Sequence, residues 1–429
     1  MLSIGIDIGT TTICAIVFDT EAEKIIESVT EPNDAMLSSK EPWEKIQDAQ
    51  KIYDKASGII ERLAEKHKKI LSIGITGQMH GILYIDKSGN ILSPLYFWQD
   101  GRGNLTYGEK TYAEEVSGKT GKNLASGYGS VTHFYNLKND LVPTDAFKFC
   151  TIYDYLAMRL AGLSEPVISM SSAASLGITD DKMFPKIVNG IELIGETRFG
   201  VKISVAIGDN QASFLGSVRN TDSSLLVNVG TGSQISFTVK DAPSISGTEL
   251  RPYINDEFLL VGAPLCGGRA YAVLKDFYLE IIRSTGQDCE NIYEIMEESV
   301  CDIYNENSVD VVTKFSGSRE NPDETGSISG ITVNNFTMSS LTLGVLKGIV
   351  NELYEIFEKT DRKFSTLVGS GNGIRYNKAL QKLFSEKFSL QLKMPLYEEE
   401  AAFGACLFSL TAANHYKNIS EAQRVIEYE

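Results

Sequence analysis

The chain begins with the stretch IGIDIGTTT at residues 4–12, and a closely similar stretch, LVNVGTGS, follows at residues 226–233. In the second stretch Asn228 takes the place that Asp7 holds in the first. The two stretches lie about half of the 429-residue chain apart. Two copies of one pattern at this separation predict a protein built from two related halves.

Each stretch predicts a β-hairpin whose turn suits phosphate. An apolar run with one polar residue leads into Gly-Thr, and a second β-forming run follows at residues 13–18 and 234–239. Glycine permits close approach of a ligand, and consecutive amide N–H groups with threonine hydroxyls offer a concave set of donors to phosphate oxygens. An acidic residue before such a turn, here Asp7, can hold Mg²⁺ directly or through water. Either hairpin alone could equally be an ordinary turn, but the pair favours phosphate binding.

The composition is that of an ordinary globular protein, with 42% hydrophobic and 22% charged residues, and the length predicts two or three domains. A net charge of -16 argues against nucleic acid or an anionic membrane as the main partner, but not against a nucleotide substrate. The six cysteines are scattered without a C-x-x-C pair, which argues against structural zinc and a disulfide scaffold. No apolar run is long enough to span a bilayer and no basic leader precedes the first strand, so we expect a cytoplasmic protein.

Helix and strand patterns alternate along the chain. Residues 43–68 predict an amphipathic helix, and residues 71–81 predict a buried strand that ends in a glycine-flanked polar cluster. Residues 205–212 repeat the strand with a polar end, and residues 364–377 form a strand that leads into a glycine-rich turn. This alternation is typical of an α/β fold, in which ligands gather where strands end in loops.

The boundary between the two halves is expected near residues 219–223, just before the second hairpin. We therefore expect one α/β domain over residues 1–220 and a second, related domain over residues 221–429.

Polar and aromatic side chains cluster at the predicted strand ends and loop tips of the first half: Gln78, His80, Trp98, Gln99, Asp100, Arg102, Asp209 and Asn210. An aromatic face beside amides, carboxylates and an arginine suits a polyhydroxylated ligand, because each hydroxyl needs a donor and an acceptor. Taken alone, His80 is more often a structural histidine, and Asp209 could equally cap the helix that follows it. The glycine-rich turn at residues 369–373 fits neither the P-loop pattern nor the dinucleotide fingerprint.

Eight motifs follow one another along almost the whole chain: DIGTTT, GITGQMHG, WQDGR, GDNQ, NVGTGS, CGGRA, GSGNGIRYN and EEEAAFGACLF. This series resembles the FGGY family of carbohydrate kinases, within the actin-like ATPase superfamily. The resemblance implies two actin-like, ribonuclease H-like domains that are related by a pseudo-twofold duplication and close on ATP and a sugar in the cleft between them. GQMHG is shared with xylulokinases, whereas WQDGR, GDNQ and GSGN are more similar to the sedoheptulokinase branch.

The resemblance also implies roles for individual residues. Asp209 matches the catalytic base, which accepts the proton of the sugar hydroxyl as that hydroxyl attacks the γ-phosphorus, and Asp7 matches the aspartate associated with magnesium. The positions that match the two phosphate loops are Thr10, Thr11, Thr12, Gly230, Thr231 and Gly232. The positions that match the adenosine region are Gly371, Asn372 and Asn377. The positions that match the sugar site are Gln78, Met79, His80, Trp98, Asp100, Arg102 and Asn210.

The expected function is ATP-dependent phosphorylation of a terminal hydroxyl of a sedoheptulose-like ketose, with Mg²⁺ as the metal. The expected partners are the sugar and ATP, without nucleic acid or membrane, in a monomer or homodimer. Ser318 departs from the family pattern, in which many members carry an acidic residue, and the chain resembles a short member of the family.

Three alternatives stay open. One is another sugar kinase of the same mechanism, such as a xylulokinase. Another is an actin-like or chaperone-like ATPase, which would have no need of the QMHG and WQDGR clusters. The last is an inactive sugar-binding relative, which the presence of Asp7 and Asp209 disfavours.

Overall fold

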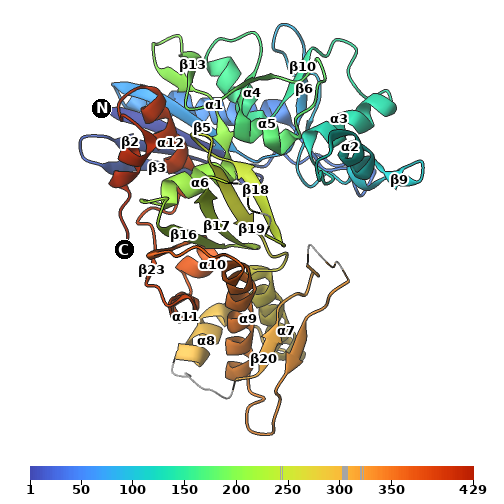
Figure 1. Cartoon of the computed structure of the whole chain (residues 1–429), viewed down its shortest axis with the longest axis vertical. Coiled ribbons are helices and arrows are strands. Elements are labelled where there is room, and N and C mark those ends of the chain that lie inside the picture. Colours follow the sequence, from blue (N-terminus) through green and yellow to red (C-terminus); the bar gives the residue numbers. More distant parts are fainter. Residues whose placement is uncertain (242, 244, 302–307, 319–320, 322) are drawn as a thin grey trace. The chain divides into compact units, whose positions relative to one another are not determined.

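The computed structural model describes residues 1–429 except 242, 244, 302–307, 319–320 and 322 (Figure 1). The chain divides into two compact units. The first comprises Met1–Arg219, Pro252–Asp256 and Glu399–Val425, and the second comprises Asn220–Arg251, Glu257–Glu398 and Ile426–Glu429. The helix near the C-terminus thus belongs to the first unit, whereas the division that we predict at residue 220 assigns it to the second half.

The central sheet of the first unit contains six strands that pair one after another (Figure 1). Its strands, in spatial order, are β13 (Leu193–Glu196), β14 (Lys202–Ser204), β5 (Ile70–Gly77), β1 (Leu2–Ile8), β2 (Thr12–Asp19) and β3 (Lys24–Pro32), and β15 (Ile207–Gly208) also pairs with β5. The strands β1 and β2 form the predicted hairpin, with Asp7 opposite Cys14, and β5 runs parallel to β1. The alternation of strand and helix therefore produces the expected α/β sheet.

Helices that pack on this sheet include α1 (Ala49–Lys66), α4 (Ile152–Leu160) and α12 (Glu400–Ala412). A Cβ atom at Gly5 would lie 1.9 Å from the carbonyl oxygen of Ala402, and one at Gly74 would lie 1.8 Å from that of Ala405. Glycine in β1 and β5 therefore allows α12 to approach the strands at backbone distance. The alanine-rich sequence of α12 serves the same close packing.

The helix α1 begins at Ala49, later than the periodicity of residues 43–68 predicts. The side chain of Asp48 accepts a hydrogen bond from the backbone N–H of Lys51 and so caps the helix at that point. The residues just before the cap form the short strand β4 (Ile46–Gln47), which pairs with β7 (Leu95–Tyr96). This pairing brings Gln47 next to the segment that leads to Trp98.

Smaller elements complete the first unit. The strands are β6 (Leu83–Ile85), β8 (Thr106–Tyr107), β9 (Lys110–Thr111), β10 (Lys148–Cys150), β11 (Val167–Ser169) and β12 (Lys186–Val188). The helices are η1 (Arg102–Asn104), α2 (Tyr112–Thr120), α3 (Gly129–Lys138), α4 (Ile152–Leu160), α5 (Met170–Leu176), α6 (Asp209–Ser217), α13 (Ile419–Ala422) and η2 (Gln423–Val425).

The second unit repeats the plan of the first (Figure 1). Its sheet has the order β18 (Thr248–Pro252), β19 (Phe258–Gly262), β17 (Ser233–Val239), β16 (Ser224–Val229), β22 (Thr366–Ser370) and β23 (Leu392–Lys393). The strands β16 and β17 form the second predicted hairpin, and β22 runs parallel to β16 as β5 does to β1. The duplication read from the two hairpins therefore extends to the sheets around them.

Helices surround this second sheet together with a short hairpin. They are α7 (Gly268–Ser284), α8 (Ile292–Cys301), α9 (Met338–Glu358), α10 (Asn372–Arg375) and α11 (Lys378–Phe388), and the hairpin pairs β20 (Asp310–Val312) with β21 (Ser327–Ser329). Within the described residues, none of the helices is both long and apolar enough to cross a membrane.

Candidate active site

Asp7 lies near the end of β1, where the first phosphate turn begins. Its Oδ1 atom is buried and has no hydrogen-bond partner within the part of the chain that the structure describes. Burial raises the pKa of Asp7 to about 7, and the negative charges of Asp209 and Glu399 add to this effect. The carboxylates of Asp209, at the start of α6, and of Glu399, just before α12, therefore both act on Asp7 within the first unit.

Asp7 fits the requirements of a magnesium-associated residue. A buried carboxylate oxygen without a partner is stabilised by a proton or by a cation, and a divalent ion would reverse its raised pKa. Over the described ranges, no group of three or more His, Cys, Asp and Glu residues could hold a metal ion with protein ligands alone. Magnesium suits this arrangement, because it commonly keeps several waters and combines one or two carboxylates with substrate phosphates.

Asp209 is the first residue of α6, directly after β15. The N-cap position is Gly208, so Asp209 stands in the first turn of the helix rather than at its cap. The Thr76 hydroxyl donates to the carbonyl oxygen of Ile207 at 2.7 Å and ties this strand end to β5. A Cβ at Gly208 would lie 2.7 Å from Met79 Sδ, so glycine here allows the Asp209 turn to approach the GQMHG segment.

Two buried amide oxygens follow Asp209 in the same helix. Oδ1 of Asn210 and Oε1 of Gln211 are both buried without a hydrogen-bond partner among the residues described. The other end of the Gln211 amide donates to the carbonyl oxygen of Pro252 at 3.0 Å. A buried acceptor without a donor is costly, so the Asn210 oxygen suits a hydroxyl donor of a ligand.

Trp98 joins the sugar-site candidates to the first phosphate turn. Its indole N–H donates to Thr10 Oγ1 at 3.0 Å, and the Thr10 hydroxyl donates in turn to Gln78 Oε1 at 3.2 Å. Trp98 is 45% exposed, whereas Gln78 is buried. The Thr10 hydroxyl is thus already engaged by protein, while the side chains of Thr11 and Thr12 are exposed.

His80 has an unusual backbone conformation, with a φ of 74°. Such a value is uncommon outside glycine and often accompanies a functional constraint. The Nδ1 atom of His80 lies 2.8 Å from the carbonyl oxygen of Ser175, which only accepts, so Nδ1 carries the N–H that donates to this carbonyl. The ring also packs against Tyr128, with 4.4 Å between centroids, and the preceding Met79 is buried.

Asp100 and Arg102 are fully buried and bound to protein partners. The Arg102 guanidinium donates to Asp100 Oδ1 at 2.6 Å, to Asn136 Oδ1 at 2.5 Å and to Glu44 Oε1 at 3.2 Å. The contacts fix the loop that carries Trp98. The structure therefore joins Trp98 to the first turn and places the start of α6 beside the GQMHG segment. Asp100 and Arg102 are instead bound to each other and to other partners inside the protein.

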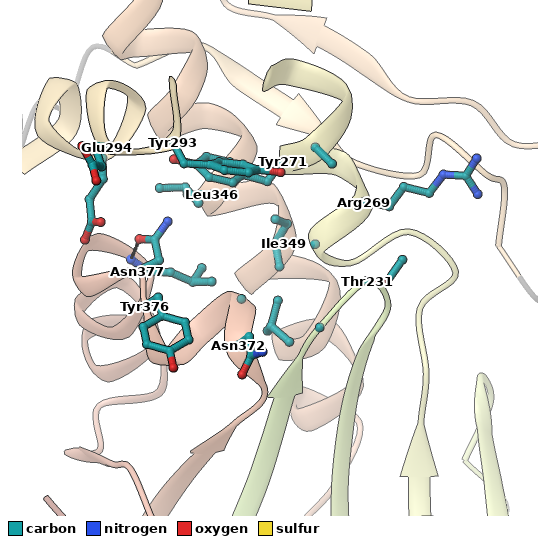
Figure 2. Close-up of a pocket in the computed structure, with 17 residues that line it drawn as sticks. Thr231, Arg269, Tyr271, Tyr293, Glu294, Leu346, Ile349, Asn372, Tyr376 and Asn377 are labelled. Carbon is teal, nitrogen blue, oxygen red and sulfur yellow. Dashed lines mark hydrogen bonds between the residues drawn. The ribbon is translucent and has the colours of Figure 1, made fainter. Parts of the chain in front are cut away.

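The second unit contains a cavity of about 620 Å³ (Figure 2). Four residues predicted to bind the nucleotide line it, from two separate turns: Gly230, Thr231, Asn372 and Asn377. The other two predicted positions, Gly232 and Gly371, lie in the same turns without lining the cavity. The Asn377 Oδ1 atom accepts a hydrogen bond from the N–H of Leu380 and caps α11.

A pair of stacked tyrosines lines one end of the cavity. The rings of Tyr271 on α7 and Tyr293 on α8 are 5.6 Å apart with an interplanar angle of 20°. Figure 2 shows them at one end, with Asn372 and Thr231 toward the other. An aromatic and aliphatic surface suits a heterocyclic base, and the loop amides suit phosphate. We did not predict either tyrosine, although Tyr271 follows the CGGRA motif directly.

The CGGRA motif places the N-terminus of α7 against the second phosphate turn. A Cβ at Gly268 would lie 2.0 Å from the carbonyl oxygen of Gly230, and Gly267 has a φ of 50°. The N–H of Arg269 donates to the carbonyl oxygen of Thr231 at 2.8 Å. Because the N-terminus of a helix carries partial positive charge, this contact adds an electrostatic contribution to the phosphate turn.

Residues 2–180 match the model of the N-terminal domain of the FGGY family of carbohydrate kinases. The chain carries an FGGY N-terminal domain. A sedoheptulokinase from Mus musculus is 24% identical over 95% of this chain and 97% of its own length. A xylulose kinase from Staphylococcus epidermidis is 22% identical over 97% of this chain and 89% of its own length. These matches identify the protein as a sugar kinase, a phosphotransferase, with an N-terminal domain of the FGGY type.

The solved structure of a xyloylose kinase from Brucella ovis superimposes on this FGGY protein with a TM-score of 0.84 at 20% sequence identity. The match covers 100% of this chain and 94% of the other. It confirms the predicted α/β fold of two actin-like domains. The kinase family implies ATP as the second substrate.

Proposed function

We propose that the protein transfers the γ-phosphoryl group of Mg-ATP to a terminal hydroxyl of a ketose, with a sedoheptulose-like sugar as the preferred substrate. The observation that carries this proposal is the placement of Asp209 at the start of α6, beside the buried acceptor of Asn210 and within electrostatic reach of Asp7. A carboxylate, a hydroxyl acceptor and a candidate magnesium ligand are the groups that direct phosphoryl transfer needs.

In this proposal Asp209 accepts the proton of the sugar hydroxyl as the hydroxyl oxygen attacks the γ-phosphorus and ADP leaves. The Asn210 oxygen accepts a hydrogen bond from a second hydroxyl of the sugar. The N–H groups of the turn at residues 9–12 bind phosphate oxygens. Mg²⁺, when bound beside Asp7, would supply positive charge that neutralises the phosphates.

On the sugar side, the exposed face of Trp98 and the imidazole of His80 provide an apolar surface and a polar group for a ketose. We propose that Gln78, Met79, Asp100 and Arg102 shape this surface from behind, because all four are buried. The sedoheptulokinase relative supports a sedoheptulose-like substrate. The xylulose kinase relative, together with the QMHG segment, supports D-xylulose as the second candidate.

On the nucleotide side, we propose that the adenosine occupies the cavity of the second unit. The base would lie against Tyr271 and Tyr293, with Asn372 and Asn377 along the adenosine. The phosphates would extend toward Gly230 and the N-terminus of α7. We also propose that residues 1–220 bind the sugar and that residues 221–429 bind the nucleotide.

A coupled assay of ADP release tests this function with sedoheptulose, D-xylulose, D-ribulose, L-fuculose and glycerol as acceptors. We expect sedoheptulose to give the highest kcat/KM. A higher value for D-xylulose would support the second candidate and contradict the first. Failure of all five acceptors to raise ADP formation above the rate without sugar would contradict the proposed function.

A further inference from the structure

We propose that Gln47 is a positioning residue that connects the first phosphate turn to the sugar side of the site. The inference rests on the kinase function proposed above. Gln47 lies in β4 and is fully buried. Its Nε2 atom donates to the carbonyl oxygen of Thr10 at 3.0 Å, and its Oε1 atom accepts from Gln78 Nε2 at 2.8 Å. One amide therefore holds a phosphate turn with its donor and a sugar-side residue with its acceptor.

These contacts belong to a hydrogen-bonded chain that runs in one direction. The indole of Trp98 donates to the hydroxyl of Thr10, which donates to Gln78. Gln78 donates to Gln47, which donates back to the carbonyl of Thr10. Hydrogen bonds arranged in this way polarise and strengthen one another. Rotation of either amide by 180° would bring like atoms together, so the chain fixes the orientation of both glutamines.

The contact with Thr10 controls the direction of a neighbouring N–H group. Because a trans peptide is planar, the Thr10 carbonyl and the Thr11 N–H point to opposite sides of their shared peptide. Asn33 holds the two adjacent carbonyls, since its Nδ2 donates to Gly9 at 2.8 Å and its backbone N–H donates to Thr11 at 2.8 Å. Three successive carbonyls are thus bound by Asn33 and Gln47, so the N–H of Thr10 points away from the Asn33 side chain and the N–H of Thr11 points away from Gln47.

Gln47 and Asn33 both bind the first turn, but Gln47 also binds a residue on the sugar side. Asn33 binds the turn at two carbonyls, whereas Gln47 binds the turn and Gln78. The pairing of β4 with β7 also places Gln47 opposite Leu95, three residues before Trp98. A shift of the Gln47 amide would therefore move the phosphate turn and the sugar-facing loop together.

The test compares kcat, the two KM values and the unfolding midpoint of the full-length enzyme and three variants, with the best acceptor from the assay above. Gln47→Met keeps the length and burial of the side chain and removes the hydrogen bonds to Thr10 and Gln78, together with the weak one that Nε2 donates to Met36 Sδ at 3.5 Å. Gln47→Glu keeps an acceptor for Gln78 and donates to Thr10 only when its carboxyl is protonated. Gln50→Met is the matched control, because Gln50 is exposed and its amide donates to the nearby Asp54 Oδ1 at 2.8 Å, on the surface of α1.

We expect Gln47→Met to lower kcat by about 10- to 100-fold, which is the scale of a misplacement of about 1 Å. The KM for the sugar should rise, and the KM for ATP should change less than the KM for the sugar, because the cavity proposed for the adenosine is lined by residues of the second unit. The activity of Gln47→Glu relative to the wild type should fall as pH rises, since the introduced carboxyl then loses its donor proton. Gln50→Met should match the wild type in every quantity.

Three results would overturn the inference. If Gln47→Met lowered kcat with both KM values unchanged, a smaller fraction of folded enzyme would explain the loss. If Gln47→Met matched Gln50→Met, Gln47 would have no part in the reaction. If the wild type showed no sugar-dependent turnover, the proposed kinase function would fail and this inference would fail with it, which the measurement on the unmodified enzyme alone reveals.

Discussion

Asp7 and Asn228 occupy the same position in the two hairpins, but their side chains have different surroundings. The Asn228 amide donates to Ser370 Oγ at 2.7 Å across the pair of strands β16 and β22. The Oδ1 atom of Asp7 is buried without a hydrogen-bond partner in the described structure. The polar side chain before the second turn therefore has a hydrogen-bond partner within the protein, whereas the one before the first turn is a carboxylate that can hold a cation.

We expect Asp7→Asn to raise the magnesium concentration needed for half-maximal activity and to lower kcat at saturating magnesium. The substitution keeps the shape of the side chain and removes the charge that favours a divalent ion. Magnesium titrations of activity at fixed ATP provide the measurement. An unchanged magnesium dependence would remove Asp7 from its proposed role.

The same substitution should change how stability depends on pH in metal-free buffer. The pKa of Asp7 is raised to about 7 in the folded state, so between about pH 4 and pH 7 the folded protein binds a proton that the unfolded chain has released. The free energy of unfolding of the wild type should therefore fall as pH rises through this interval. The difference from Asp7→Asn should change by at most about 1.4 kcal/mol per pH unit. Parallel pH profiles in urea unfolding would contradict the raised pKa.

Tyr293→Ala should weaken nucleotide binding without affecting the chemical step. Loss of the stacked pair removes an interaction worth about 0.5–1.5 kcal/mol beyond its buried area, so the KM for ATP should rise by about 2- to 10-fold at unchanged kcat. Phe199→Ala is a suitable control, because Phe199 is 74% exposed and belongs to the first unit. Equal KM values for the two variants would show that the base binds elsewhere.

Gly268→Ala should separate the N-terminus of α7 from the second phosphate turn. The added Cβ would lie 2.0 Å from the carbonyl oxygen of Gly230, so one of the two segments must move. We expect the affinity for Mg-ADP, measured by titration calorimetry, to fall by about tenfold or more, because phosphate donors are lost together. Gly118→Ala in α2 is the matched control, since a Cβ there would meet no described atom within 4 Å. Similar affinities in the two variants would refute the role of this contact.

The parts of the fold that could be predicted are those set by the pattern of apolar, polar and glycine residues within one continuous stretch. Each hairpin is a continuous stretch with apolar strands and a glycine turn, and the duplication is visible because both copies keep that pattern. The start of α1 was predicted too early, because the apolar spacing continues through Ile46 although Asp48 caps the helix two residues later. Periodicity alone does not register a cap that depends on one side chain.

The candidate site was predictable only where its residues lie in recognisable turns. Tyr271 and Tyr293 stand on different helices, and their stacking depends on how α7 and α8 pack rather than on either sequence alone. Asp100 and Arg102 look like ligand-binding groups in a polar loop, but they bond to each other at 2.6 Å and are fully buried. Residue type and spacing do not distinguish a buried ion pair from a pair that faces a ligand.

The central claim is that Asp209 is the base in phosphoryl transfer to a sugar. Its most direct test is the kcat of Asp209→Ala with the best ketose acceptor, measured alongside the dissociation constant for Mg-ATP. We predict a loss of about 100-fold or more in kcat, the scale of a positioned general base, at an unchanged dissociation constant. Turnover close to that of the wild type would contradict the account.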